Sequence, residues 1–186
     1  MANKDAAFGL KAIGKVGQNR DNQGLSEYSI AASSSAIYQW DPVIMADTGE
    51  VEVAAAGEVL LGSLNGVFYT DASTSKPTWA NHLAASNTAT DIVGFVADDP
   101  YERFEIQSAG TVAQTNIGNC ADIAYTAGAA PNYISKVEIS GTMADTAAQL
   151  KIIGVSKDPD NNELGAANAN VIVTIAEHFL TQTAGI

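Results

Sequence analysis

The segment Asn170-Val171-Ile172-Val173-Thr174-Ile175 decides the fold class of this chain. Five of its six residues are β-branched. Branching at Cβ restricts the side chain in a helix and suits the pleated surface of a sheet. We therefore predict that this segment forms a strand at the centre of a β-sheet.

Stretches of similar character recur throughout the chain before this segment. Some alternate polar and apolar side chains, as half-buried strands do, and others are short apolar runs bounded by turn residues. They are Glu27–Ile30, Val43–Met45, Val51–Val53, Val59–Tyr69, Ile92–Ala97, Phe104–Gln107 and Leu150–Val155. No sustained helical period accompanies them. The pattern predicts an all-β chain, a β-sandwich or barrel of about ten short strands with an extended N-terminal arm.

Two segments of this pattern need separate interpretation. Asn65-Gly66 interrupts the run Val59–Tyr69, which predicts a glycine kink or a bulge between two strand pieces. Residues 71–90 are rich in Ala, Ser, Thr and Asn and contain Pro77 and Trp79. We interpret residues 71–90 as a long surface loop in which Trp79 contacts a partner.

Residues 1–25 differ from the rest in charge and in apolar content. Their four basic side chains face only two acidic ones, whereas the remainder of the chain is strongly acidic. Large apolar residues are sparse in this stretch. We predict that residues 1–25 form an extended arm, and that residues 26–186 form a single β domain.

The charge of the whole chain limits its partners. Nine Lys and Arg residues stand against 21 Asp and Glu, for a formal net charge of −12. A free-standing nucleic-acid binder would carry a basic surface, so we expect no nucleic-acid partner. No uncharged apolar stretch is long enough to span a bilayer, so we expect no membrane partner. The single cysteine, Cys120, cannot form an internal disulfide.

Motifs for catalysis or cofactor binding are incomplete. Gly9–Lys15 resembles a P-loop, but Val16 replaces the Ser or Thr that would bind Mg²⁺. Asp158–Asn162 resembles the start of a calcium loop, but the required Gly and Glu do not follow. His82 and His178 lie in no metal-binding spacing. We therefore predict a protein that is not an enzyme and holds neither a cofactor nor a metal.

Several blocks of the sequence resemble the head decoration, or cement, proteins of tailed bacteriophages. The resemblance is carried, in order, by Gly9–Val16, Glu27–Ala31, Ala36–Val43, Leu61–Tyr69, Val96–Pro100, Phe104–Gln107 and Asn170–His178. It spans most of the chain. It implies a β-rich virion protein that binds the outer surface of the capsid and clamps neighbouring major capsid subunits. The resemblance favours a homotrimer over a dimer, and it brings no catalytic residue.

The resemblance also implies that the N-terminal arm lies across the capsid subunits. On this hypothesis basic side chains dock on the capsid while apolar ones fill small grooves. The candidate residues are Lys4, Phe8, Leu10, Lys11, Ile13, Lys15 and Arg20.

Two other classes of function stay open. One is a phage tail protein or a receptor- or carbohydrate-binding β module, with Trp79 on its contact surface. The other is a hydrolase that uses Glu50 and Glu52, which would face the same side of one strand.

Overall fold

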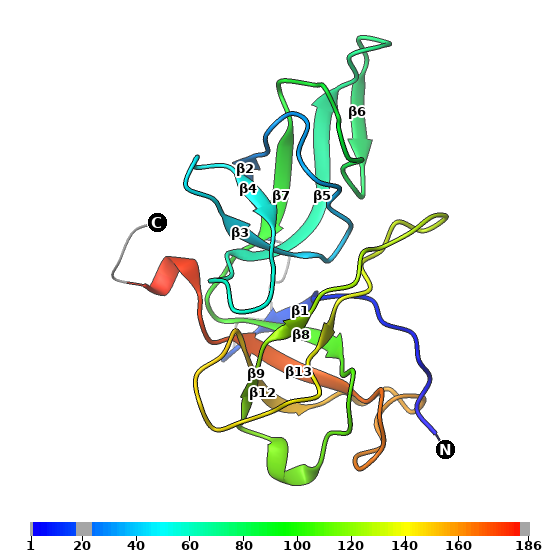
Figure 1. Cartoon of the computed structure of the whole chain (residues 1–186), viewed down its shortest axis with the longest axis vertical. Coiled ribbons are helices and arrows are strands. Elements are labelled where there is room, and N and C mark those ends of the chain that lie inside the picture. Colours follow the sequence, from blue (N-terminus) through cyan, green and yellow to red (C-terminus); the bar gives the residue numbers. More distant parts are fainter. Residues whose placement is uncertain (1, 18–23, 183–186) are drawn as a thin grey trace.

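A computed structural model describes residues 2–17 and 24–182. Within these residues the structure holds thirteen strands and two short 3₁₀ turns, at Gln114–Asn116 and Phe179–Thr181. The all-β prediction is confirmed. The strands form two large antiparallel sheets and one two-stranded sheet, and the two large sheets occupy the upper and lower parts of Figure 1.

The lower sheet has five strands. In spatial order they are β1 (Lys11–Lys15), β8 (Glu102–Gln107), β13 (Asn170–Ile175), β12 (Leu150–Val155) and β9 (Cys120–Ala121). The β-branched strand β13 lies in the middle, as its sequence predicts. Val171, Val173 and Ile175 point into the core from one face of this strand.

The upper sheet has six strands and is built around the long strand β5. Its members are β2 (Ser26–Ser29), β7 (Val93–Ala97), β5 (Gly62–Thr70), β3 (Pro42–Met45), β4 (Val51–Val53) and β6 (Pro77–Ala80). Strand β7 pairs along one edge of β5, while β3 and β6 share the other edge. The predicted bulge is present, because the β5–β7 register shifts between Leu64 and Gly66.

Strand β6 corrects one prediction. Residues 71–90 do not form a continuous loop, because Pro77–Ala80 pairs with Val67–Thr70 of β5. Trp79 therefore projects from an ordered strand. The four-residue strand β6 was not predicted because the sequence around it is rich in small polar residues. Such a short strand is stabilised mainly by its pairing with β5.

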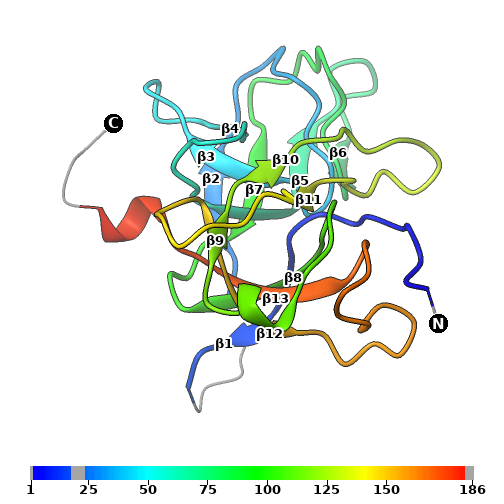
Figure 2. The ribbon, with the colours of Figure 1, turned by 60° about the horizontal axis from the view of Figure 1, so that its bottom comes forward.

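Each large sheet has its own hydrophobic core. The two sheets lie one above the other in Figures 1 and 2. The large core packs against the lower sheet. The two-stranded sheet of β10 (Ile123–Ala124) and β11 (Glu138–Ile139) contributes Ile123 and Ile139 to it. The small core lies within the upper sheet. The two meet where neighbouring residues divide between them: Leu60 and Ala97 belong to the large core, Leu61 and Val96 to the small one.

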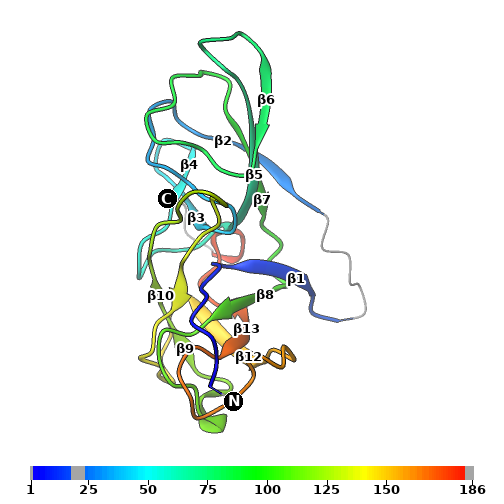
Figure 3. The same ribbon diagram turned by 90° about the vertical axis from the view of Figure 1, so that its right-hand side faces the viewer.

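The N-terminal residues correct a second prediction. Residues 11–15 form β1, which pairs with β8 (Figure 3), and Leu10 is fully buried in the large core. Gly9 has a φ of +81°, and a Cβ there would lie 2.4 Å from both Ser135 Cβ and the Trp40 carbonyl oxygen. The backbone is thus fitted tightly into the body. Residues 2–17 are therefore not a free arm.

Candidate functional site

Most of the candidate capsid-binding side chains have partners within the chain. Lys4 forms an ion pair with Asp160, and Lys15 forms one with Asp99 at 2.7 Å. The Lys11 ammonium lies 5.5 Å from the centre of the Trp40 ring, and Phe8 meets the same ring edge to face at 6.5 Å. Each of these four side chains therefore has a partner within its own chain.

The other candidates on the N-terminal stretch are placed differently. Leu10 is buried and Ile13 is half-buried, so Leu10 is not available to fill a groove on a partner. Arg20 lies outside the described residues. The predicted capsid contact of Leu10 is therefore wrong, because the large core of its own chain already holds this side chain.

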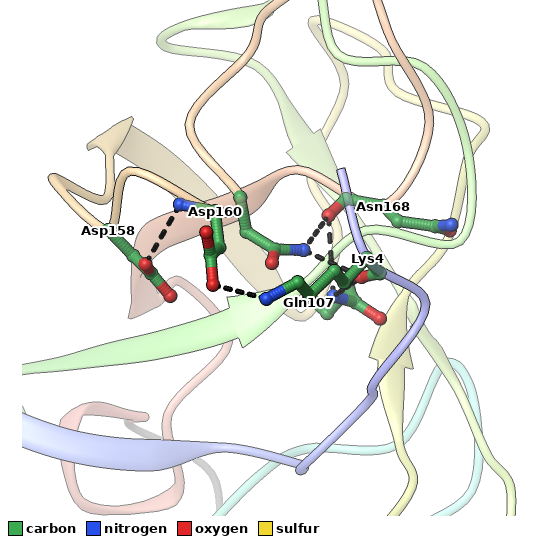
Figure 4. Close-up of polar contacts among 6 residues, drawn as sticks. Lys4, Gln107, Asp158, Asp160 and Asn168 are labelled. Carbon is green, nitrogen blue, oxygen red and sulfur yellow. Dashed lines mark hydrogen bonds and ion pairs between the residues drawn. The ribbon is translucent and has the colours of Figure 1, made fainter. Parts of the chain in front are cut away.

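A network of polar contacts fastens residues 3–6 to the loop that precedes β13 (Figure 4). The Gln107 amide accepts a hydrogen bond from the Ala6 N–H at 2.8 Å and donates one to the Lys4 carbonyl at 3.0 Å. The Asn161 amide donates to the carbonyls of Lys4 and Asn168, both at 2.7 Å. The ion pair with Asp160 raises the pKa of Lys4. Because Lys4 is exposed, this pair adds little to the energy, and the buried amides hold the segment.

One face of the molecule gathers exposed apolar side chains around Leu25. We call it the Leu25 surface and define it by Val16, Leu25, Tyr101, Leu180 and the Lys15–Asp99 pair. Tyr101 is 69% exposed, Val16 52% and Leu180 50%. Val16 joins Tyr101 through a backbone hydrogen bond of 2.8 Å. Leu25, Tyr101, Leu180 and the Lys15–Asp99 pair line a hollow of about 580 Å³, and the backbone of Val16 joins its edge at Tyr101.

The charged groups on this surface are held in fixed positions. Lys15 and the Tyr101 N–H bind the Asp99 carboxylate and lower its pKa. Asp98 accepts hydrogen bonds from the Ser26 hydroxyl at 2.9 Å and the Tyr28 hydroxyl at 2.6 Å. Burial and the neighbouring Asp98 raise the pKa of Tyr28 to about 12. An approaching partner thus meets an ordered arrangement of charge beside apolar side chains.

A second hollow, which we call the aromatic groove, lies on the outer face of β5, β6 and β7. Trp79 is 69% exposed. Its ring lies 4.9 Å from the Phe68 ring and 5.0 Å from the Phe95 ring, nearly parallel to the latter at 22°. The groove is lined by Leu25, Asn65, Gly66, Trp79, Ala80, Asn81 and Phe95. Leu25 is the residue that it shares with the Leu25 surface.

Sequence reasoning found Trp79 but missed the residues that surround it. Phe68 faces Trp79 because the β5–β6 register pairs these two residues. Phe95 comes within stacking distance because β7 pairs along the opposite edge of β5, with Phe95 facing Gly66. The only available signal was an aromatic residue in each of the predicted strands Val59–Tyr69 and Ile92–Ala97, and that signal says nothing about which strands are neighbours.

Within residues 2–17 and 24–182, no group of three or more His, Cys, Asp or Glu side chains is placed to hold a metal ion. His82 is stacked on Tyr133 at 3.9 Å, and burial lowers its pKa. His178 is buried where β13 leads into the last 3₁₀ turn, and its pKa is also lowered by burial.

No family model, curated protein or solved structure matches this chain. In the part of the chain that the structure describes, no helix has the length and apolar character needed to cross a bilayer.

Proposed function

We propose that this chain is a capsid decoration protein that binds the outer surface of a tailed-phage head and clamps neighbouring major capsid subunits. The Leu25 surface carries the proposal. Exposed apolar side chains grouped on one face favour a protein partner. The fixed charges beside them would set the orientation of binding. The class of the partner comes from the sequence resemblance.

In this proposal the rigid body attaches through its surface, in place of a free arm. Lys15 lines the hollow of the Leu25 surface, and Lys11 lines a neighbouring hollow that also contains Leu25, so one of the basic residues expected to meet the capsid lies at the proposed interface and another lies beside it. Self-association into a homotrimer forms part of the proposal, because several linked contacts raise avidity without a stronger single contact.

The first test is quantitative mass spectrometry of purified virus particles that carry this chain. The measured quantity is the number of copies per major capsid protein. A ratio near one supports a decoration protein that covers the shell. A ratio of a few per cent would indicate that the chain belongs to the tail or to a vertex and would contradict the proposal. Absence of the chain from the particle would also overturn it.

The second test addresses the binding surface. We expect Tyr101→Ala combined with Leu180→Ala to weaken binding to purified capsids by at least about tenfold, as loss of central apolar contacts does at other interfaces. Trp79→Ala is the matched control, because Trp79 and Tyr101 have the same exposed fraction of 69%. Wild-type affinity in the double variant would exclude the Leu25 surface as the capsid contact.

A further inference from the structure

The aromatic groove holds one large ring in a fixed, exposed position. Phe68 and Phe95 pack against Trp79 from β5 and β7, so the indole is held while most of its surface stays in solvent. Fixing a ring before it meets a ligand reduces the conformational entropy lost on binding. An aromatic face carries negative partial charge and attracts weakly positive C–H groups.

Among the residues that the structure describes, the lining of the groove carries no charge, although the chain has a net charge of −12. Its described members are apolar side chains, one glycine and the amides of Asn65 and Asn81. An ionic ligand would find no opposite charge here. An uncharged ligand with many hydroxyls would find groups that both donate and accept hydrogen bonds.

Both amides are positioned by the fold. Asn65 is exposed at the bulge of β5, where the register against β7 shifts. The Asn81 amide donates a hydrogen bond to the Asn132 carbonyl at 2.9 Å, and its oxygen lies 3.1 Å from His82 Nδ1. The groove has a volume of about 580 Å³, within the usual range for sites that bind small molecules.

We propose that the aromatic groove binds a neutral oligosaccharide. A sugar ring presents a C–H face that would stack on Trp79, and its hydroxyls would pair with Asn65 and Asn81. This function goes beyond attachment to a capsid and uses a different hollow, which shares Leu25 with the Leu25 surface. A folded protein partner suits the Leu25 surface better, because three exposed apolar side chains and an ion pair lie there. The groove offers one large exposed ring between two amides.

The test uses the full chain and an array of neutral oligosaccharides built from glucose, galactose, mannose and N-acetylhexosamines. Positive sugars are then titrated calorimetrically. We expect a Kd of about 1 mM or tighter, and a loss of at least about tenfold in Trp79→Ala. Trp79→Phe should keep part of the affinity because a ring remains. Tyr101→Ala is the matched control and should bind the sugar like the wild type.

The outcomes separate this proposal from the capsid proposal. Sugar binding that depends on Trp79 and not on Tyr101 supports the groove, whatever the capsid assay shows. Absence of binding across the array overturns the proposal, as does binding that Trp79→Ala leaves unchanged in a variant with wild-type circular dichroism. If the wild-type chain binds no sugar on the array and Trp79→Ala abolishes capsid binding, the groove belongs to a protein interface and the sugar proposal is overturned.

Discussion

At the scale of single residues, Asp41 is the clearest case of a carboxyl group whose surroundings disfavour its ionised form. It is fully buried between the N-terminal segment and the upper sheet. Burial raises its pKa from 3.8 to about 6, although hydrogen bonds from the Ser135 side chain and the Tyr38 N–H act in the opposite direction. The Tyr38 N–H donates to Asp41 Oδ2 at 2.8 Å.

This pKa shift predicts the direction of a pH effect on stability. The folded state binds the Asp41 proton more tightly than the unfolded chain does. The contribution of protonated Asp41 to the stability of the folded state is therefore fully present below pH 3.8 and is lost as the pH rises through about 6. The shift corresponds to roughly 3 kcal/mol.

We expect Asp41→Asn to remove this part of the pH dependence, because the amide stays neutral and still accepts the hydrogen bond from Tyr38. Urea unfolding of both proteins between pH 4 and pH 8 measures the difference. Asp47→Asn, which removes an exposed carboxylate, is the control for the loss of one charge. A constant difference between wild type and Asp41→Asn over this range would contradict the shift.

At the scale of elements, the N-terminal segment and β1 show how a stretch with weak local signals becomes part of a sheet. Leu10 fills the large core, β1 extends the sheet beyond β8, and the amides of Gln107 and Asn161 hold the backbone before Leu10. The stretch therefore stabilises the fold. Its removal would not isolate a capsid-binding function.

We predict that Leu10→Ala lowers the free energy of unfolding by about 2–5 kcal/mol, because it leaves a cavity in a packed core. Lys4→Ala removes only an exposed ion pair and should leave the free energy of unfolding almost unchanged. Urea denaturation at pH 7 measures both. Equal stability of Leu10→Ala and the wild type would mean that residues 2–17 do not pack on the body.

At the scale of the whole molecule, the two cores are coupled by the chain itself. Leu60 and Leu61 are adjacent in sequence but enter different cores, as do Val96 and Ala97. Strands β5 and β7 cannot leave the small core without displacing residues at the edge of the large one. The two sheets should therefore unfold together.

Calorimetry of two core variants tests this coupling. Ile152→Ala opens a cavity in the large core and Leu83→Ala opens one in the small core. We predict that each lowers the midpoint of one and the same transition. Two separate transitions, of which Leu83→Ala shifts only one, would show that the sheets unfold independently.

The sequence alone determined the all-β class, the central strand at residues 170–175 and the bulge at Asn65-Gly66. These features depend on β-branching, alternation and glycine, which act between neighbouring residues. The sequence also indicated Trp79 as a contact residue, and its acidic composition led us to expect no nucleic-acid partner.

Only the tertiary structure decided where the N-terminal residues lie and which side chains share a surface. The contacts of residues 3–6 reach partners more than 100 positions away, such as Gln107 for Ala6 and Asp160 for Lys4. Pairing over such distances leaves no local periodicity to detect. The rings of Phe68, Trp79 and Phe95 come together only because the registers of β6 and β7 on β5 place them on one face. Register is set by the packing of the whole sheet, and a single strand does not encode it.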